Sequence, residues 1–394
     1  MKILTEGSFD GKKVLLRCEL NVPLKDGVIT DDTRIVESLP TIKYLLEHNA
    51  AVIIMAHLGR PEGTGYEEAF SLAPVAEHLK SLLGREVTLA GDCFGDKTAA
   101  QAEALRSGEI LMLENVRFVK GETKGSEEFA EKLASYGNVY VNDAFGTTHR
   151  AHSSTAIIAK FFPNDKYAGK LLEHEIVNLE KLLKTPARPF TAIIGGSKVS
   201  SKIDVLKNMA EKVDNLIVGG GMAYTFIKAL GGTVGNSIHE DDKIDIAREV
   251  MEVCKEKNVV FALPEDTVVA DAFDNEANRK TVPTMEIPDG WEGLDIGAAS
   301  IEKFKNIVRN SKTILWNGPL GVFEMDNFAT GTLEIGKTVG EISQQGAFSA
   351  VGGGDSIAAV KKLGIASQIS YISTGGGAMI EYLEGKTLPG IAAL

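Results

Sequence analysis

The feature that most constrains the fold is a regular alternation of short apolar runs with amphipathic helical patterns. In the first half, runs of strand length occur at residues 14–18, 51–56, 87–90, 110–113 and 139–141. In the second half, they occur at residues 192–194, 216–218, 259–263, 313–316, 348–351 and 369–372. Most of these runs are separated by segments with apolar side chains three and four residues apart, as in helices. This alternation predicts an α/β fold of parallel sheets with helices on both faces.

The two halves meet at a long helical pattern over residues 167–183. A proline-containing segment at residues 185–189, TPARP, follows and ends it. We therefore predict two Rossmann-like domains, residues 1–169 and 186–380, joined by a hinge helix over residues 170–185.

The composition restricts the class of partner. The chain has 394 residues, 44% hydrophobic and 24% charged, which is typical of a soluble globular protein. A net charge of -12 argues against nucleic acid or an anionic membrane as the main partner. The N-terminus shows no signal-peptide pattern, and no run approaches the length of a membrane span. Cys18, Cys93 and Cys254 are far apart and match neither a disulfide framework nor a zinc site, so we expect a cytoplasmic protein.

Cations follow the predicted strands of the first half at equivalent positions. They are Arg34, His57, Arg60, Arg117 and Arg150. In parallel sheets ligands bind outside the carboxyl ends of the strands, so these side chains should meet at one edge. Their concentration in an acidic chain favours one anion site over unrelated surface charges. For His57 two interpretations remain open: a structural histidine that bonds a loop, or a direct ligand contact.

Glycine-rich loops follow the strands of the second half. Their sequences are GGSK, GGGM, NGPLG, GGGDS and STGGG. Glycine lets backbone amides approach a ligand closely, and successive amides bind anions. GGGDS opens a predicted helix that Gly364 should cap, so the helix N-terminus would favour phosphate. One such loop could be an ordinary turn, but several at matching strand ends predict a nucleotide-phosphate site.

Two lysines occupy an unusual place in the segment TAIIGGSKVSSKIDVLKNM, residues 191–209. We interpret this segment as strand, tight turn and helix, with Lys198 and Lys202 on one face of the first helical turns. Cations there oppose the helix macrodipole. A bound anion would offset that repulsion, although two solvated lysines are the alternative.

A phosphate-loop pattern elsewhere is misleading. GTLEIGKT, residues 331–338, fits the P-loop expression, but no hydrophobic strand precedes its first glycine. Leu333, Ile335, Val339 and Ile342 fit one face of an amphipathic helix better. The chain also lacks a G-x-G-x-x-G fingerprint, a metalloprotease helix, a nucleophile elbow and a protein-kinase motif set.

Taken in order, several motifs make the chain resemble the phosphoglycerate kinase family over nearly its whole length. They are RCELNVP, HLGRP, ENVRF, VNDAFGTTHRAHSS, GGSKVSSK, GLDIGAAS, LWNGPLGVFE, VGGGDS and STGGGA. The resemblance implies reversible, Mg²⁺-dependent phosphoryl transfer from 1,3-bisphosphoglycerate to ADP, giving 3-phosphoglycerate and ATP in glycolysis. It also implies that residues 381–394 return to the first domain.

The resemblance assigns site residues to each half. It implies that the first half binds the triose through Glu19, Asn21, Arg34, His57, Leu58, Gly59, Arg60, Arg117 and Arg150. It implies that the second half binds the nucleotide through Lys198, Lys202, Gly293, Leu294, Asn317, Glu324, Gly353, Gly354, Asp355 and Ser356. Asp355 would lie beside Mg²⁺, while Arg34, Lys198 and the amides around Gly376 would act on the transferred group.

Three positions depart from the family pattern. Glu19-Leu20 stands where aspartate-phenylalanine is usual, which puts the carboxylate contact in doubt. Tyr371 stands where many relatives have a histidine near the hinge, and Lys170 replaces an apolar residue. The last two changes would affect closure of the domains rather than the chemistry.

Two other functions fit a two-domain α/β chain less well. An NAD-dependent dehydrogenase would need the missing glycine fingerprint with an acidic residue about 20 positions later. A non-catalytic anion-binding protein would not need two sites of different chemistry. We therefore expect a hinge-bending monomeric enzyme whose partners are small molecules.

Overall fold

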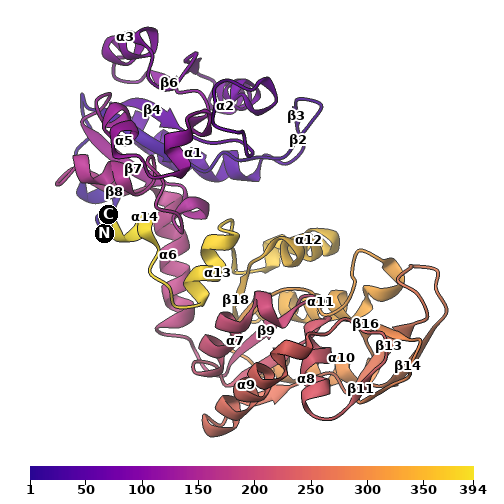
Figure 1. Cartoon of the computed structure of the whole chain (residues 1–394). Coiled ribbons are helices and arrows are strands. Elements are labelled where there is room, and N and C mark those ends of the chain that lie inside the picture. The colour runs from indigo at the N-terminus through magenta and orange to yellow at the C-terminus, as the bar shows by residue number, and fades with distance from the viewer. The chain divides into compact units, whose positions relative to one another are not determined.

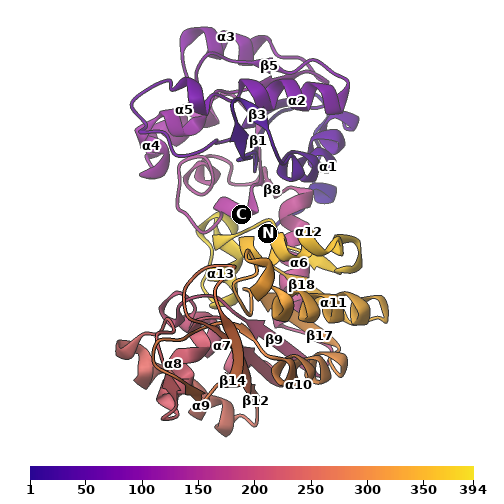
Figure 2. The same cartoon turned by 90° about the vertical axis from the view of Figure 1, so that its right-hand side faces the viewer.

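The computed structural model describes every residue from Met1 to Leu394, and the chain forms two compact units. Unit 1 comprises Met1–Val177 and Thr387–Leu394, and unit 2 comprises Asn178–Lys386. Each unit is built on a six-stranded sheet in which all neighbouring strands are parallel (Figure 1). Helices flank each sheet, as the view in Figure 2 also shows. The predicted fold class is confirmed.

The sheet of unit 1 has the order β5-β6-β4-β1-β7-β8. Its strands are β1 (Lys13–Cys18), β4 (Ala51–Met55), β5 (Thr88–Leu89), β6 (Ile110–Met112), β7 (Val139–Asp143) and β8 (Lys166–Ala168). Every residue of β4, β6 and β7 is buried, because helices cover both sides of a parallel sheet. The direction of strand addition reverses at β1, from which the chain first builds toward β4 and later toward β7.

Helices before, between and after the strands complete unit 1. They are α1 (Thr33–Glu47), α2 (Ala73–Leu83), α3 (Asp96–Ala104), α4 (Lys120–Thr123), α5 (Glu127–Ala134) and the C-terminal α14 (Pro389–Ala392). Ser126 caps α5, since its Oγ accepts a hydrogen bond from Phe129 N at 3.3 Å. The sequence interpretation missed α3, whose polar sequence buries only Thr98 and Ala102.

The helical pattern over residues 167–183 began too early, whereas the predicted hinge helix over residues 170–185 begins at the right residue and ends at Leu183 rather than at residue 185. Lys166–Ala168 form β8 and pair with β7, and α6 runs from Lys170 to Leu183. Asp143, the last residue of β7, fixes the start of the helix because its Oδ1 accepts hydrogen bonds from Leu171 N and Leu172 N at 2.9 and 3.2 Å. A carboxylate at a helix N-terminus satisfies amides that have no partner within the helix. The boundary between the units, after Val177, falls within α6.

The sheet of unit 2 has the order β12-β10-β9-β17-β18-β19. Its strands are β9 (Phe190–Ile194), β10 (Asn215–Val218), β12 (Val260–Ala262), β17 (Thr313–Asn317), β18 (Phe348–Val351) and β19 (Tyr371–Ile372), all within or next to predicted runs. The helices are α7 (Ile203–Ala210), α8 (Met222–Ala229), α9 (Ile244–Glu256), α10 (Ala298–Arg309), α11 (Thr330–Gln344), α12 (Gly354–Leu363) and α13 (Gly377–Leu383). Strand addition reverses at β9, so the loops after β9 and β17 lie at the position where such sheets bind ligands.

Short strands outside the two main sheets were missed. In unit 2, β13 (Asp266–Ala270) pairs with both β14 (Arg279–Pro283) and β16 (Glu292–Ile296), while β11 (Thr233–Val234) pairs in parallel with β15 (Glu286–Ile287). In unit 1, β2 (Leu24–Lys25) and β3 (Val28–Ile29) form a hairpin. Its turn residues Asp26 and Gly27 have φ values of 51° and 77°, so the Asp-Gly pair was a readable hairpin signal.

The segment that resembled a phosphate loop is part of helix α11, as predicted. Ile335, Val339 and Ile342 are buried in the core of unit 2. Lys337 points away from that core and pairs with Glu334, with 2.8 Å between Nζ and Oε1. Gly364 has a φ of 66° and ends α12 in a left-handed conformation, which confirms the predicted cap.

The C-terminal residues complete unit 1. Gly390 N donates a hydrogen bond to Thr148 O at 2.8 Å, and Lys166 Nζ donates one to Ala393 O at 2.6 Å. The segment that belongs to unit 1 begins at Thr387, whereas the sequence interpretation began it at residue 381. The intervening residues belong to unit 2, where α13 continues to Leu383. No helix in the protein is long and apolar enough to cross a membrane.

Candidate functional site

The predicted residues of unit 1 lie in loops that leave the carboxyl ends of its strands. Glu19 and Asn21 follow β1, His57 to Arg60 follow β4, Arg117 follows β6, and Arg150 follows β7. Arg34 lies in the first turn of α1. The parallel sheet thus brings residues from distant parts of the sequence to one edge, as the strand pattern predicted.

Glu19, Asn21 and Arg34 form one group. Arg34 Nη1 donates a hydrogen bond to Asn21 O and lies 3.6 Å from Glu19 Oε1. The Glu19 side chain is only 3% exposed, and its other oxygen, Oε2, is buried without a hydrogen-bond partner. An unsatisfied buried oxygen is costly unless a ligand or water meets it, so Glu19 has an acceptor available for a hydroxyl group.

The loop HLGRP is held in place by its neighbours. Asn21 Oδ1 accepts a hydrogen bond from Gly59 N at 2.8 Å, and Arg117 Nη1 donates one to Gly59 O at 2.8 Å. Asn115 Nδ2 donates to Leu58 O at 2.7 Å. These bonds fix the loop backbone, while Nε of Arg117 is buried with no protein partner and is available to an anion.

Arg17, which is fully buried within β1, determines the state of His57. Its Nη2 lies 3.0 Å from His57 Nδ1, and its Nε donates a hydrogen bond to Ser154 Oγ at 2.8 Å. A guanidinium has only donors, so Nδ1 of His57 must be the unprotonated acceptor and the ring proton lies on Nε2. Burial, followed by the positive charges of Arg17 and Arg117, lowers the pKa of His57 well below its usual value. His57 is therefore a neutral hydrogen-bond donor.

A buried carboxylate balances part of this charge. Glu122 accepts hydrogen bonds from Ser154 N at 2.9 Å and from Ser154 Oγ at 2.6 Å, and its Oε1 lies 4.0 Å from His152 Nδ1. Burial, followed by the charges of Arg117, Arg17 and Arg150, lowers the pKa of His152 to about 4. His152 Nδ1 is buried and lacks a hydrogen-bond partner. The remaining predicted cations, Arg60 and Arg150, are exposed.

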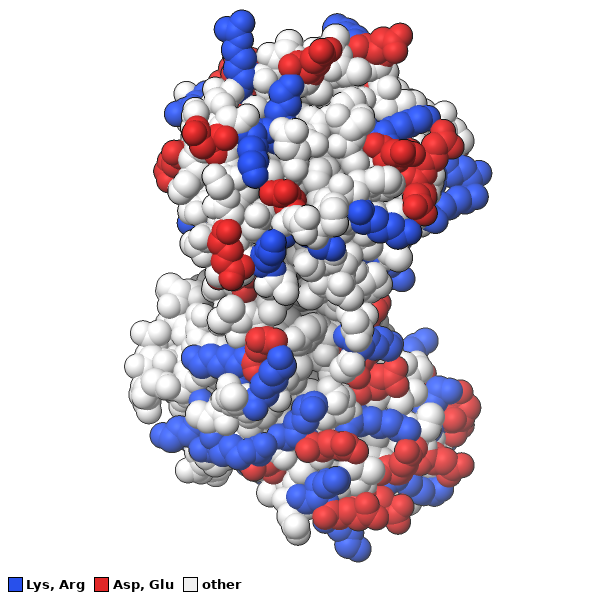
Figure 3. Space-filling model, turned by 90° about the vertical axis from the view of Figure 1, so that its left-hand side faces the viewer, with Lys and Arg blue, Asp and Glu red and all other residues white.

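This basic cluster consists of Arg17, Arg34, His57, Arg60, Arg117, Arg150 and His152. Burial, followed by the charge of Arg17, lowers the pKa of Arg117, and Arg60 contributes in the same direction. The cluster therefore holds cations close enough to repel one another, which an anion would relieve. Elsewhere the charges are mixed: on the face shown in Figure 3, both basic and acidic side chains appear on each unit.

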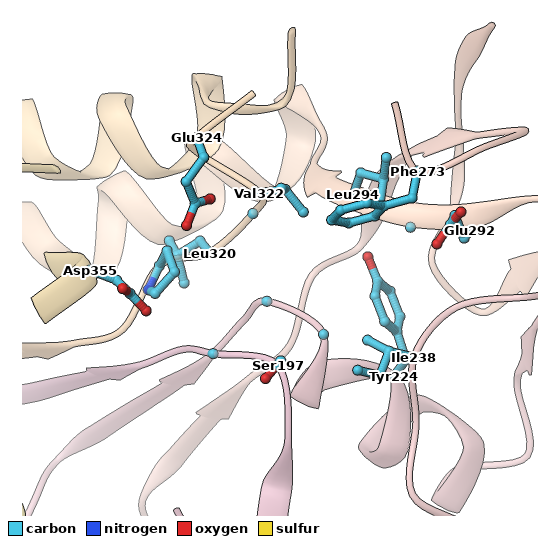
Figure 4. Close-up of a pocket in the computed structure, with 16 residues that line it drawn as sticks. Ser197, Tyr224, Ile238, Phe273, Glu292, Leu294, Leu320, Val322, Glu324 and Asp355 are labelled. Carbon is cyan, nitrogen blue, oxygen red and sulfur yellow. The ribbon is translucent and has the colours of Figure 1, made fainter. Parts of the chain in front are cut away.

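Unit 2 contains a cavity of about 460 Å³ at the carboxyl end of its sheet (Figure 4). Four predicted residues line it: Gly293, Leu294, Glu324 and Asp355. The sequence interpretation missed other lining residues, among them Tyr224, Ile238, Phe273, Glu292 and Val322. Phe273 and Glu292 come from the region of the antiparallel sheet, whose strands were not predicted.

Glycines let the loops at the strand-order reversal pack backbone against backbone. A Cβ on Gly195, after β9, would lie 2.0 Å from Pro319 O, and one on Gly318, after β17, would lie 2.1 Å from Gly195 O. Real Cβ atoms do not approach oxygen so closely, so only glycine fits at these two positions. Gly293 similarly leaves room for the Tyr224 ring, since its Cβ would lie 2.0 Å from the tyrosine hydroxyl oxygen.

The remaining predicted nucleotide residues form a connected group beside the cavity. Lys202 Nζ donates a hydrogen bond to Asn317 Oδ1, and Asn317 Nδ2 donates one to Gly352 O at 2.7 Å. Ser356 Oγ accepts a hydrogen bond from Gly318 N at 2.6 Å. Gly353, with a φ of 92°, and Gly354 open helix α12. This N-terminus offers free amides to an anion.

The predicted placement of the two lysines on one helix was wrong. A 3₁₀ turn at Val199–Ser201 follows Lys198, and α7 begins only at Ile203, after Lys202. Lys198 is exposed, whereas Lys202 is partly buried, and burial lowers its pKa. Gly376, with a φ of 51°, precedes the first residue of α13.

The structure shows the environment of Lys170 and Tyr371, two of the three positions that depart from the family pattern. Lys170 lies over the ring of Tyr44, with 4.6 Å between Nζ and the ring centre, so its charge is engaged within unit 1. Tyr371 is buried at the start of β19. All three cysteines are free and buried.

Comparison with known proteins gives one consistent result. The family model described as phosphoglycerate kinase matches residues 4–386. The chain is 50% identical to a phosphoglycerate kinase of Porphyromonas gingivalis, with 98% of each chain covered. It is 52% identical to the cytosolic phosphoglycerate kinase of Triticum aestivum, covering 99% of this chain and 97% of that one.

The solved structures agree. The structure of phosphoglycerate kinase from Coxiella burnetii matches with a TM-score of 0.91 and 41% identity, covering 99% of this chain and 97% of that one. The enzyme from Pyrococcus horikoshii matches with a TM-score of 0.83 and 33% identity, covering 100% and 98%. From these matches we conclude that the chain belongs to the phosphoglycerate kinase family.

Proposed function

We propose that unit 1 binds the triose and unit 2 binds the nucleotide in the family's glycolytic reaction, phosphoryl transfer between 1,3-bisphosphoglycerate and ADP. The protein is a kinase that uses a carboxyl group as acceptor in the ATP-consuming direction. One observation carries the assignment of the two substrates: the edge of unit 1 gathers cations, whereas the edge of unit 2 offers an apolar cavity beside glycine loops.

The chemistry of the basic cluster suits a small polyanion. 3-Phosphoglycerate carries a phosphate, a carboxylate and a hydroxyl group. Arginine binds phosphate and carboxylate through paired donors, which supports roles for Arg34, Arg60, Arg117 and Arg150. The buried Nε of Arg117 is one donor without a protein partner, and Oε2 of Glu19 is an acceptor suited to the hydroxyl group. Asn21, Leu58 and Gly59 would shape this part of the site.

The reaction needs charge neutralisation more than proton transfer. The nucleophile in the ATP-consuming direction is already a carboxylate, so no general base is required. Phosphoryl transfer depends on positioning and electrostatic stabilisation of the moving group. We assign this stabilisation to Lys198, Arg34 and the backbone amides around Gly376. Lys202, Asn317 and Ser356 would hold the phosphates that stay on the nucleotide.

We assign Mg²⁺ to Asp355. This carboxylate lines the cavity next to the N-terminus of α12. No group of three or more His, Cys, Asp or Glu side chains in the protein is arranged to hold a metal. Mg²⁺ commonly binds through one or two carboxylates together with substrate phosphates, and one carboxylate beside a phosphate site fits that pattern. When bound, the ion would neutralise phosphate charge.

Direct transfer between substrates on separate units requires the units to approach and exclude water. We propose that α6 serves as the hinge helix between a triose-binding unit 1 and a nucleotide-binding unit 2, and that the enzyme acts as a cytoplasmic monomer.

Kinetics of paired variants test the division of substrates. A coupled assay should show ATP formation from 1,3-bisphosphoglycerate and MgADP. Arg117→Ala should raise KM for 3-phosphoglycerate by at least tenfold and leave the Kd of MgATP unchanged, and Lys202→Ala should do the reverse. The exposed Arg106→Ala and Lys255→Ala are the controls in units 1 and 2. If either variant changed the KM for 3-phosphoglycerate and the Kd of MgATP by the same factor, the assignment would be contradicted.

A further inference from the structure

The cavity of unit 2 has two chemically different ends. Asp355 marks one end, where the glycine-rich start of α12 favours phosphate. The other end is walled by the apolar side chains of Ile238, Phe273 and Leu294, with the carboxylate of Glu292 beside them. Figure 4 shows Asp355 and Glu292 at opposite ends of the cavity, with Leu294 and Phe273 near Glu292.

The apolar end has the character of a slot for a flat ring. Phe273 is 63% exposed and Ile238 is 43% exposed, although both are large hydrophobic residues that line the cavity. Such exposed apolar surface in a concave site is typical of ligand contact. With phosphates at the glycine end, the nucleobase is the part of the ligand that reaches this slot.

A β-bulge explains why three successive residues line the slot. Val268 pairs with Asp295 and Val269 pairs with Gly293, so Leu294 has no partner across the antiparallel sheet. In a regular strand, successive side chains point to opposite faces. The bulge lets Glu292, Gly293 and Leu294 all contact the cavity, and bulges often redirect a side chain in this way next to active sites.

The carboxylate of Glu292 is an acceptor without a protein donor. It is partly buried, yet it makes neither an ion pair nor a hydrogen bond. The nearby cation Lys280 lies over the ring of Trp291 instead, with 4.1 Å between Nζ and the ring centre. Burial raises the pKa of Glu292, as expected for a carboxylate that lacks compensation. A donor supplied by the ligand would satisfy it.

We infer that Glu292 is a specificity-determining residue that accepts a hydrogen bond from the exocyclic amine of adenine. This inference rests on the proposed role of unit 2 as the nucleotide-binding unit. Adenine carries an NH₂ donor on C6, whereas hypoxanthine and guanine carry a carbonyl acceptor there. A carboxylate facing that carbonyl would place two acceptors together and leave both unsatisfied. Sites built around a substrate hydrogen bond discriminate strongly against analogues that lack it.

The test compares ADP with IDP, which differs from ADP at the base. We would measure kcat/KM for both acceptors with 1,3-bisphosphoglycerate, and Kd for both by calorimetry, in the wild type and in Glu292→Gln. The glutamine amide can accept from an amine or donate to a carbonyl. We expect the wild type to favour ADP by about tenfold or more, and the variant to reduce that ratio to about threefold or less. Glu286→Gln, an exposed position on β15, is the matched charge control and should keep the wild-type ratio.

The outcomes separate this inference from the proposed function. An active wild type whose ADP preference is unchanged in Glu292→Gln would overturn the role of Glu292 and leave the proposed function intact. A wild type that uses neither ADP nor IDP would instead refute the proposed function. The ratio of kcat/KM for ADP to that for IDP is taken within each variant. A smaller amount of folded protein lowers both values equally and leaves the ratio unchanged. Glu292→Ala, which removes the acceptor without adding a donor, should also lower the ratio.

Discussion

At the scale of single residues, the basic cluster shows how one side chain sets the chemistry of another. Arg17 is buried in β1 and can only donate hydrogen bonds, so it keeps His57 neutral with its proton on Nε2. Between the two interpretations left open by the sequence, the Arg17 contact gives His57 a structural partner and still leaves Nε2–H as a donor. The positive charge of the cluster then comes from arginines, whose charge does not depend on physiological pH.

Lys198 tests the proposed stabilisation of the transferred group. It is exposed and forms no ion pair, so Lys198→Ala should leave stability unchanged. We expect kcat to fall by about 10²–10³, the scale seen when one transition-state donor is removed. Steady-state kinetics with a urea titration would measure both quantities. A kcat close to that of the wild type would exclude Lys198 from the catalytic step.

His152 should make stability depend on pH. Burial, followed by neighbouring arginines, lowers its pKa to about 4 from the usual 6.5. The unfolded chain therefore binds a proton at a higher pH than the folded chain does, so stability is lost as pH falls from about 6.5 to about 4. In His152→Gln, the drop in unfolding free energy between pH 7.5 and pH 5 should be smaller than in the wild type. Urea titrations at the two pH values would measure it, and equal drops would contradict the assignment.

The sequence identified most of the cations of unit 1 because each follows a recognisable strand. It did not identify the roles of Arg17 and Glu122. Both side chains are buried, and both hydrogen-bond to Ser154, which is distant from each of them in the sequence. An arginine within the apolar run VLLRC was nevertheless a usable signal, since a fully buried charge needs partners.

At the scale of elements, the start of α6 depends on side chains from earlier in the chain, Thr41 for the Lys170 amide and Asp143 for the next two amides. Asp143 accepts hydrogen bonds from two amides of the first turn, and its burial raises its pKa to about 7. Replacing it by alanine leaves these amides without their acceptor. The capping oxygen of an asparagine would remain, and asparagine resembles the protonated form of the native carboxyl.

Asp143→Ala should therefore lower the unfolding free energy by about 1–2 kcal/mol, the usual range for a lost helix cap. Asp143→Asn should lose less than half of that amount. Urea unfolding followed by circular dichroism would compare the two. If both variants were equally destabilised, the loss would have to come from something other than the cap.

Strands and helices with a clear pattern of apolar residues were predicted well. Strands that mix polar and apolar residues were not. The parallel strands of both sheets are continuous apolar runs, so the sequence located nearly all of them. Of the antiparallel strands, β14 has no buried residue, whereas β13 and β16 are mostly buried but mix polar with apolar residues, as in DTVVA and EGLDI. β8 was absorbed into the helical pattern because Tyr167 and Ala168 are compatible with either structure; pairing with β7 decides it.

At the scale of the whole molecule, the proposed division of substrates predicts a ligand-dependent change in dimensions. If each unit holds one substrate, neither substrate alone satisfies the contacts of both units. Small-angle scattering should then show a clearly smaller radius of gyration with 3-phosphoglycerate and MgATP together, and little change with either one. A full decrease with MgATP alone would contradict the need for both substrates.

The resemblance indicated the family and the general organisation, but the chain alone could not give the boundary between the units. That boundary lies inside α6, after Val177, and again after Lys386. The position of this boundary depends on which unit the side chains of each helical turn pack against. A local sequence pattern does not contain that information.

The return of Thr387–Leu394 to unit 1 means that unit 2 is an insertion within it. During synthesis, unit 2 is present in one continuous stretch as soon as Lys386 has emerged from the ribosome. Unit 1 is synthesised first, but its last hydrogen bonds form only after Gly390 and Ala393 have been made and have reached Thr148 and Lys166. Unit 1 is therefore the first unit whose translation begins and the last whose fold can be completed.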